Sequence, residues 1–332
     1  MSTAPSPEQQ LLDHATQSIA VGSKSFAAAS RLFDPATRRS AVMLYAWCRH
    51  CDDVIDGQEA GHSATLVEQH EVNQRLAGLV AQTHAVYAGQ PAEAPAFAAF
   101  AEVVKRHGIK ERYAQEHLAG FAMDVHQRHY LLIEDTLDYC YHVAGVVGLM
   151  MAQVMGVSDE RTLDRACDLG MGFQLTNIAR DIVEDARVGR CYLPQAWLDE
   201  LSIPTQHLAD PQYREPLAVL AKRLVDLAEP FYISAQAGLS ALPWRSAWAV
   251  ATACGVYREI GIEVEKRGAH AWDGRVSTSK LDKLRLVFAG LGQAVTSRGR
   301  QWPERPADLW QRPLQPSVTG HRAWPAVAGE AC

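Results

Sequence analysis

The stretch from Asn177 to Asp185 places its polar residues on one side of a predicted helix. A helix advances about 100° per residue, so Asn177, Asp181 and Asp185 fall within roughly 80° of one another. Three further polar residues extend this side to an arc of roughly 140°: Gln174, Arg180 and Glu184. The apolar residues point the other way: Leu175, Ile178, Ala179, Ile182 and Val183. Such a segment must bury one face in a core while the other face keeps its carboxylates.

A solvated helix face usually mixes lysines and glutamates in pairs four residues apart. Here three acids share the face with a single arginine. The imbalance favours a functional face, and an ordinary surface helix is the alternative for this stretch taken alone.

A second helix, predicted for residues 35–56, repeats the pattern. Asp34-Pro35 is typical of a helix start, and Gly57 ends the segment. Four polar residues lie within an arc of roughly 60°, with Asp53 at its edge: Tyr45, Arg49, Asp52 and Asp56. One Asp-x-x-x-Asp pair is weak evidence, because such pairs are common in acidic segments. Two such faces, each with an arginine close to the acids, predict a shared site.

Other helical patterns cover residues 11–30, 58–95, 96–130, 135–157, 213–241, 244–267 and 278–298. No alternating run long enough for a sheet is present. The predicted fold is therefore all-α, with one helical domain over residues 11–300 and a frayed N-terminus over 1–10. Residues 301–332 hold five of the 16 prolines and predict a disordered tail. Gly145 and Gly148 indicate either close helix packing or room for a ligand.

Composition excludes several classes of protein. The net charge of −6 without a basic block argues against a nucleic-acid partner. The seven scattered cysteines and the lack of a signal-like N-terminus predict a reduced, cytoplasmic protein. The longest apolar stretch, residues 143–157, is too short to span a bilayer. We expect at most peripheral contact with the inner face of a membrane.

Carboxylates gathered around one cavity repel each other unless cations intervene. Oxygen ligands at helical spacing suit Mg²⁺ or Mn²⁺, and Mg²⁺ fills its remaining positions with water and substrate phosphate. Arg49 and Arg180 would bind phosphate directly. Apolar helices around the rest of the cavity would hold a hydrocarbon chain, so the pattern predicts a prenyl diphosphate substrate.

Five blocks in order resemble the squalene/phytoene synthases, over roughly residues 14 to 295. The blocks are Ser23-Lys-Ser-Phe26, Tyr45 to Asp56, Tyr139-Cys-Tyr-His-Val-Ala-Gly-Val-Val-Gly148, Gln174 to Asp185, and Arg190-Cys-Tyr-Leu-Pro194. The first and third blocks are most similar to bacterial phytoene synthases of carotenoid pathways. The resemblance implies a single-domain helical bundle of the class I isoprenoid synthase type with a central cavity.

The resemblance also implies a reaction. Two geranylgeranyl diphosphates would condense head to head, through a cyclopropylcarbinyl diphosphate, to 15-cis-phytoene with release of two diphosphates. This reaction is the first committed step of carotenoid biosynthesis. It would need Mg²⁺ or Mn²⁺ and no nicotinamide cofactor, and the product would pass to a desaturase.

Residue roles implied by the resemblance fall into three groups. The metal ligands are Asp52, Asp56, Asn177, Asp181 and Asp185. Tyrosines at the reaction centre, beside the catalytic aspartates, are Tyr45, Tyr139 and Tyr257. Substrate contacts are Ser25, Phe26, Arg49, Val143, Val147, Gln174, Arg180, Tyr192 and Arg275. Glu184 and Asp53 would hold these groups in place rather than bind the metal.

Three alternatives follow from the same residues. Squalene or dehydrosqualene synthesis from C15 substrates shares the metal chemistry. The squalene reaction also needs a nicotinamide reductant, and the sequence has no dinucleotide-binding motif of the form Gly-x-Gly-x-x-Gly after a strand. A non-catalytic helical lipid-binding scaffold could keep the fold. Cys48-Arg-His-Cys51 could suggest zinc or redox chemistry, but no second pair stands at a useful spacing. Asp124, His126 and His129 are interpreted as surface or packing residues.

Overall fold

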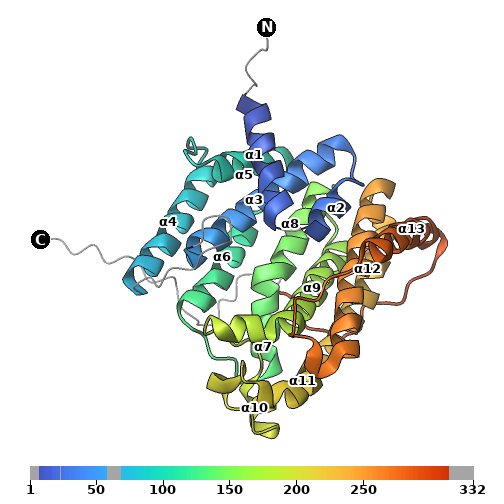
Figure 1. Cartoon of the computed structure of the whole chain (residues 1–332). Helices are drawn as coiled ribbons and strands as arrows, with labels where there is room; N and C mark the ends of the chain where they lie inside the picture. The colour runs from blue at the N-terminus through green and yellow to red at the C-terminus, as the bar shows by residue number, and fades with distance from the viewer. Residues whose placement is uncertain (1–6, 23, 58–68, 314–332) are drawn as a thin grey trace, which may run out of the picture.

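The computed structural model describes residues 7–22, 24–57 and 69–313 of the 332-residue chain. Over these ranges every regular element is helical and no strand occurs, which confirms the predicted all-α class (Figure 1). In chain order the α-helices are α1 Pro7–Gly22, α2 Lys24–Ser30, α3 Pro35–Asp56, α4 Gln69–Tyr87, α5 Pro95–His107, α6 Glu111–Val125, α7 Ile133–Cys140, α8 Val146–Val154, α9 Glu160–Arg187, α10 Gln195–Glu200, α11 Arg214–Gly238, α12 Trp244–Arg267 and α13 Lys280–Thr296.

Local sequence determines the limits of the two acid-bearing helices. The Asp34 carboxylate accepts hydrogen bonds from the backbone N–H groups of Ala36 and Thr37, at 3.1 and 3.0 Å, and so caps α3. Gly57 ends that helix with a φ of 64°, a backbone conformation that favours glycine. Asp159 caps α9 in the same way, accepting from the Thr162 N–H at 2.8 Å. Helix α3 therefore matches its predicted range of 35–56, and α9 includes the whole polar stretch from Asn177 to Asp185.

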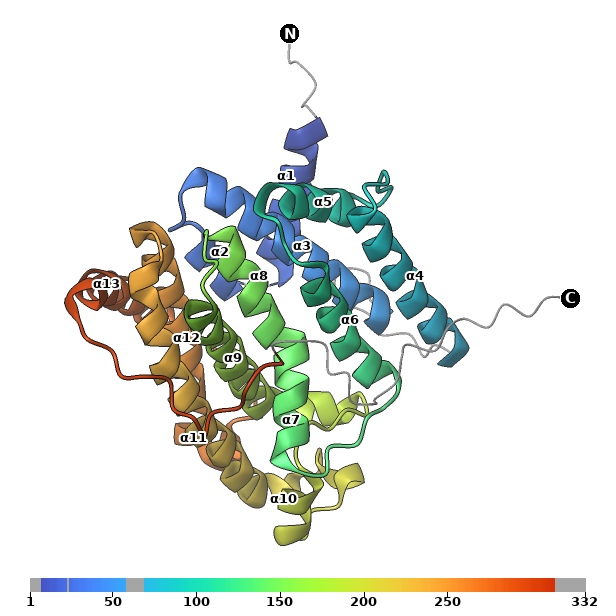
Figure 2. The same ribbon diagram turned by 180° about the vertical axis from the view of Figure 1, so that it is seen from behind.

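The long helix α9 runs through the centre of the bundle. It packs against α8, α11 and α12, and its neighbours surround it on several sides (Figures 1 and 2). The apolar face predicted from the sequence is buried in this packing: Leu175, Ile178, Ala179, Ile182 and Val183. Its polar face points toward the interior between α9 and α3.

The segment from α7 to α8 bends through a π-helical turn, Tyr141–Gly145. Glycines allow this segment to approach α9 closely. A methyl group added to Gly148 would overlap the carbonyl of Ala166, and one added to Gly170 would overlap the carbonyl of Ala144. The small residues of this segment thus allow close helix packing, and Ala144 and Gly148 also line the cavity described below.

Both predicted termini differ from the structure. Helix α1 begins at Pro7, so residues 7–10 are helical rather than frayed. Residues 301–313, predicted as part of a disordered tail, instead lie along α9 (Figure 2). Arg305 binds Asp168 and Arg312 binds Asp164. The proline-rich composition carried no sign of these partners; residues 1–6 and 314–332 lie outside the described residues.

None of the helices in the described ranges combines the length and the apolar character needed to cross a membrane.

The close approach at Gly148 gives a stability prediction. Gly148→Ala should lower the free energy of unfolding by about 1–3 kcal/mol, because the methyl group would overlap backbone that cannot move freely. Gly78→Ala in α4 is the matched control, since open space surrounds Gly78; it should raise that free energy by about 0.5–1 kcal/mol. Urea unfolding followed by circular dichroism measures both. Equal stability of Gly148→Ala and the wild type would contradict the close contact.

Candidate active site

A cavity of about 1110 Å³ lies between α3, α6, α8, α9 and α12. Along α9 its lining changes from apolar, at Leu169 and Phe173, to polar, at Asn177, Asp181 and Asp185. At 1.5 Å per residue these positions span about 24 Å of helix. The cavity therefore has a polar end and an apolar end, here named by these linings.

The two predicted acid faces meet at the polar end. From α3 the lining residues are Tyr45, Arg49, Asp52 and Asp56; from α9 they are Gln174, Asn177, Arg180, Asp181, Glu184 and Asp185. Asp53 does not line the cavity. The helical rotation inferred from the sequence is thus confirmed on both helices, and the structure brings the two faces together.

Arginines on both helices pair with these carboxylates. Arg49 binds Asp52 at 2.8 Å and Asp53 at 2.6 Å. Arg180 forms a fork with Asp181, with nitrogen–oxygen distances of 2.7 and 2.5 Å. Fork-shaped pairs of this kind are directional and fix both side chains. Each acid face therefore carries its own arginine.

Arg275 comes from the loop before α13 and binds the α9 face. It donates to Glu184 at 2.7 Å and to Asp181 at 3.3 Å. Arg275 therefore lies beside the acids of α9, and its substrate role stays a prediction. Glu184 pairs with Arg275, and its expected supporting role stays a prediction.

Arg190 is a site residue that the sequence reasoning missed. It follows α9, lines the cavity and donates to Asp56 on α3. This ion pair joins the ends of the two acid-bearing helices across the polar end. The available signal was the Arg-Cys-Tyr-Leu-Pro block, of which only the tyrosine received a role.

Asp124 is a second missed residue, because the sequence reasoning assigned it to the surface or to packing. It lies on α6, lines the cavity and accepts hydrogen bonds from the hydroxyls of Tyr139 and Tyr192, at 3.1 and 3.0 Å. The rings of these two tyrosines stack with centroids 4.4 Å apart. A single acid on a helix gives no periodic pattern, so no sequence signal marked it.

Partial burial and neighbouring acids disfavour negative charge at the polar end. Burial, and then the nearby Asp56 carboxylate, raise the pKa of Asp52 to about 7. Burial, and then Asp181, raise the pKa of Asp185 to about 7. Burial also raises the pKa of Asp124 to about 6. The arginines present do not fully offset these carboxylates, and a cation placed between them would.

The donor set fits a magnesium ion shared with a ligand. The buried Asn177 Oδ1 has no hydrogen-bond partner, so its lone pairs are available to a cation. Across the described part of the chain, no three His, Cys, Asp or Glu side chains are close enough to enclose a metal by themselves. Mg²⁺ commonly takes one or two carboxylates and completes its shell with water and phosphate. The arrangement therefore fits Mg²⁺ better than a metal held by protein alone.

Aromatic pairs lie between the polar and apolar ends. Phe26 stacks on Tyr45 with centroids 5.2 Å apart, and Phe173 stacks on Tyr257 at 4.0 Å. All four line the cavity. Ring faces attract cations. The cavity thus offers aromatic surface where a chain would pass from its charged head to its apolar tail.

Of the remaining predicted site residues, two line the cavity wall and one has a side chain outside the described residues. Val143 and Val147 line the cavity on the segment from the π-helical turn to α8. The side chain of Ser25 lies outside the described residues. Cys48 also lines the cavity, and burial raises the pKa of its thiol to about 12, so it stays protonated at neutral pH.

The fold is similar to those of solved squalene and dehydrosqualene synthases. A dehydrosqualene synthase solved with a ligand superimposes with a TM-score of 0.77, at 26% identity, over 87% of this chain and 98% of that one. A squalene synthase from Alicyclobacillus acidocaldarius gives a TM-score of 0.69 at 19% identity, over 80% and 97% of the two chains. At that identity the second likeness shows the fold alone.

Sequence comparison gives the family. Residues 19–282 match the squalene/phytoene synthase family model, and the chain belongs to this family. A 15-cis-phytoene synthase from Pantoea ananas is 60% identical over 92% of this chain and 98% of its own length. One from Enterobacter agglomerans is 62% identical over 89% and 99%.

Proposed function

We propose that this protein condenses two geranylgeranyl diphosphates head to head to phytoene, as a prenyltransferase of carotenoid biosynthesis. The observation that carries the proposal is the pair of acid faces at the polar end of a cavity of about 1110 Å³. This volume lies just above the roughly 300–1,000 Å³ of most small-molecule pockets, which suits a large substrate. High identity to proteins named 15-cis-phytoene synthase over nearly their whole length supports this substrate class.

In the proposed mechanism the polar end binds the diphosphate groups. Asp52, Asp56, Asn177, Asp181 and Asp185 would hold Mg²⁺ or Mn²⁺, which supplies positive charge to the departing diphosphate. The guanidinium groups at this end would turn from their carboxylates toward phosphate oxygens: Arg49, Arg180, Arg190 and Arg275. Gln174 would line the cavity beside these arginines.

The allylic cation formed when the C–O bond breaks is attacked by the C2–C3 double bond of the second substrate. Loss of a proton to the released diphosphate would close the cyclopropane ring. The resulting cyclopropylcarbinyl diphosphate would ionise in the same place, rearrange and lose a second proton to diphosphate. The aromatic pairs that line the cavity would stabilise these cations. Tyr139 and Tyr192 are held by Asp124, so their hydroxyls are fixed during the reaction. Apolar walls keep water from the cations.

Product analysis tests the proposal directly. Purified protein with Mg²⁺ should form a C40 hydrocarbon from the C20 diphosphate without NADPH, because the proposed reaction needs no reductant. Separate incubations with C15 and C20 diphosphates, with and without NADPH, are extracted and analysed by mass spectrometry. A dominant C30 product would instead indicate squalene or dehydrosqualene synthesis. No diphosphate release from either substrate would indicate a non-catalytic scaffold.

The metal roles give a second prediction. Asp52→Asn and Asp181→Asn should each lower product formation by roughly 10²-fold or more. Each substitution removes a carboxylate that would bind the metal ion beside the departing diphosphate. Mg²⁺ with inorganic diphosphate should raise the melting temperature of the wild type and not of these variants. Asp226→Asn, which removes only an exposed pair with Lys222, is the control. Turnover like the wild type with intact helical circular dichroism would contradict the assignment.

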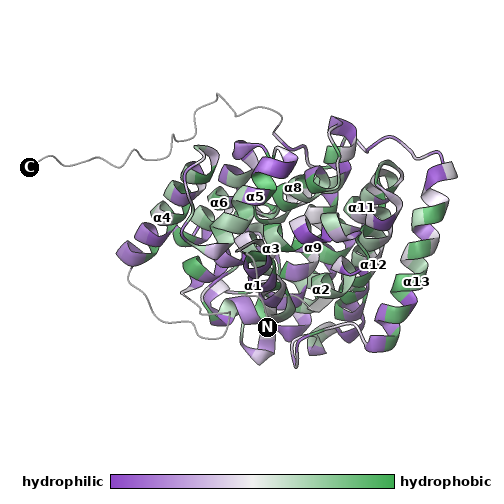
Figure 3. Cartoon of the chain, turned by 90° about the horizontal axis from the view of Figure 1, so that it is seen from above, coloured by the Kyte–Doolittle hydropathy of each residue, from purple (hydrophilic) through white to green (hydrophobic). Residues whose placement is uncertain are grey.

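We also propose that α13 is the place of peripheral membrane contact. Its outward apolar residues lie within an arc of roughly 60° and are exposed: Leu281, Leu284, Phe288 and Val295. Helix α13 lies at the edge of the bundle (Figure 3). Residues 275–300 contain six Lys or Arg and one Asp, in a chain of net charge −6. An apolar stripe with basic surroundings fits an anionic bilayer surface. Cytoplasmic location and handover to a desaturase stay predictions.

Vesicle binding tests the surface on α13. Leu284→Glu with Phe288→Glu should reduce co-sedimentation with phosphatidylglycerol vesicles by roughly tenfold, because two apolar side chains leave the interface and two negative charges enter it. Ile233 on α11 is 50% exposed, and Ile233→Glu is the control. This variant should bind the vesicles as the wild type does. Self-association of the wild type that is lost in the α13 variant, without vesicle binding, would assign the surface to a second copy.

A further inference from the structure

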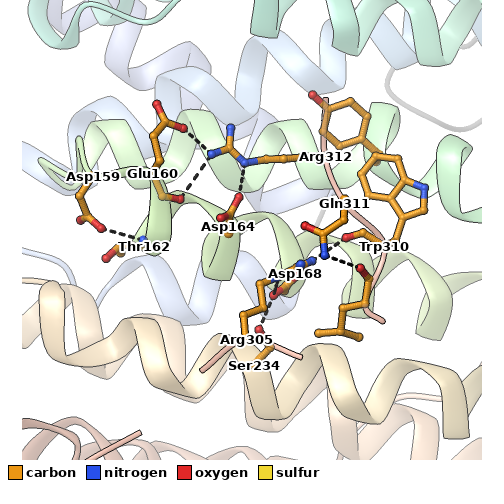
Figure 4. A network of polar contacts seen from close by, with 12 residues as sticks. Asp159, Glu160, Thr162, Asp164, Asp168, Ser234, Arg305, Trp310, Gln311 and Arg312 are labelled. Atoms are coloured by element: carbon orange, nitrogen blue, oxygen red, sulfur yellow. Dashed lines mark hydrogen bonds and ion pairs between the residues drawn. The ribbon is translucent and has the colours of Figure 1, made fainter. Parts of the chain in front are cut away.

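Residues 301–313, called here the C-terminal strap, are fastened to the first half of α9 by two arginines (Figure 4). Arg305 donates to both oxygens of Asp168, at 2.8 and 2.7 Å. Arg312 donates to Asp164 at 2.5 Å and also binds Glu160. The side chains of Asp168 and Arg312 are 1% and 3% exposed. Buried, fork-shaped pairs of this kind position a segment, because a carboxylate left alone there would be uncompensated.

The strap and the cavity contact opposite faces of the same part of α9. Glu160, Asp164 and Asp168 are four residues apart and face the strap. The cavity is lined from this part by Thr162, Ala166 and Leu169. The mean directions of the two sets differ by roughly 170° around the helix. The strap therefore supports the wall at the apolar end from behind.

Arg165 connects the strap to the cavity itself. It lines the cavity, while its guanidinium donates to the Ser234 hydroxyl at 3.0 Å and to the carbonyl of Pro303 in the strap at 2.9 Å. A long cationic side chain can line apolar space with its stem while its charged head lies elsewhere. The strap carbonyl thus helps to keep a positive charge out of the apolar end.

Two further elements of the cavity wall, α11 and the π-helical turn, are connected to the strap. Ser234 on α11 also donates to Asp168, and its neighbour Ala235 lines the cavity (Figure 4). The Trp310 ring lies 4.9 Å from the ring of Tyr141, which is in the π-helical turn. The strap therefore contacts α9 and the π-helical turn directly, and it is linked to α11 through Asp168 and Arg165.

We propose that the C-terminal strap determines how well the apolar end accepts the longer of two prenyl chains, with Arg305 as the positioning residue that acts through Asp168 and Arg165. The inference rests on the proposed function. A C20 chain has one five-carbon unit more than a C15 chain, so with the diphosphates at the polar end it reaches further toward the strap. Release of the strap would loosen the wall at the apolar end and free the guanidinium of Arg165. Binding of the longer chain would be weakened more than binding of the shorter one.

Full-length Arg305→Ala is compared with the wild type on C15 and C20 diphosphates. The KM for the C20 substrate should rise, and the ratio of kcat/KM for C20 over C15 should fall at least about fivefold, since poor fit of a few carbons has effects of this size. Arg223→Ala is the matched control. It removes another fork-shaped pair, with Glu200, on the exposed side of α11, and should keep the wild-type ratio.

Trp310→Ala is the second variant and leaves no buried charge, so it decides the question if Arg305→Ala does not fold. A fall in the C20 preference for the strap variants alone supports the inference. An unchanged ratio, or an equal loss on both substrates, in folded strap variants of an active enzyme overturns it and leaves the proposed function standing. A wild type inactive on both substrates overturns the proposed function and the inference with it.

Discussion

Crowding of partly buried carboxylates at the polar end is the constraint around which this protein is built. Asp52 and Asp185 lie on different helices, yet burial and a neighbouring acid raise the pKa of each to about 7. Such an arrangement is unfavourable for the isolated chain and is maintained by arginines. Arg190 has a special place among these, since its pair with Asp56 joins the ends of α3 and α9. The remaining charge imbalance is what makes the site suited to a cation and a diphosphate.

Helix α9 connects this electrostatic site to the rest of the molecule. Its acids line the cavity, its apolar face is buried against other helices, and its glycines admit close backbone contact. At its other half, the C-terminal strap binds Asp168 and Asp164. One rigid helix therefore carries both the charged end and the apolar end of the cavity, so the distance between them is set by helix geometry.

Much of the fold and part of the site could be predicted from local sequence. The limits of α3 follow from Asp34, Pro35 and Gly57, which act within a few residues of their own positions. The polar faces of α3 and α9 follow from the 3.6-residue period, because rotation about a helix axis is fixed by spacing. Both faces were found in this way. The roles of the residues on them stay proposals, supported by the family to which the chain belongs.

The partners of side chains far apart in the chain were decided only by tertiary structure. Asp124 and Tyr192 are 68 positions apart, and Arg305 and Asp168 are 137 apart. No local period or cap signals such pairs, because their energy arises only after the elements have packed and water has been excluded. The sequence by itself determined which helices form and which faces carry the acids. Tertiary structure decided that these faces enclose one cavity, that Arg190 and Asp124 belong to it, and that a proline-rich segment is held against α9.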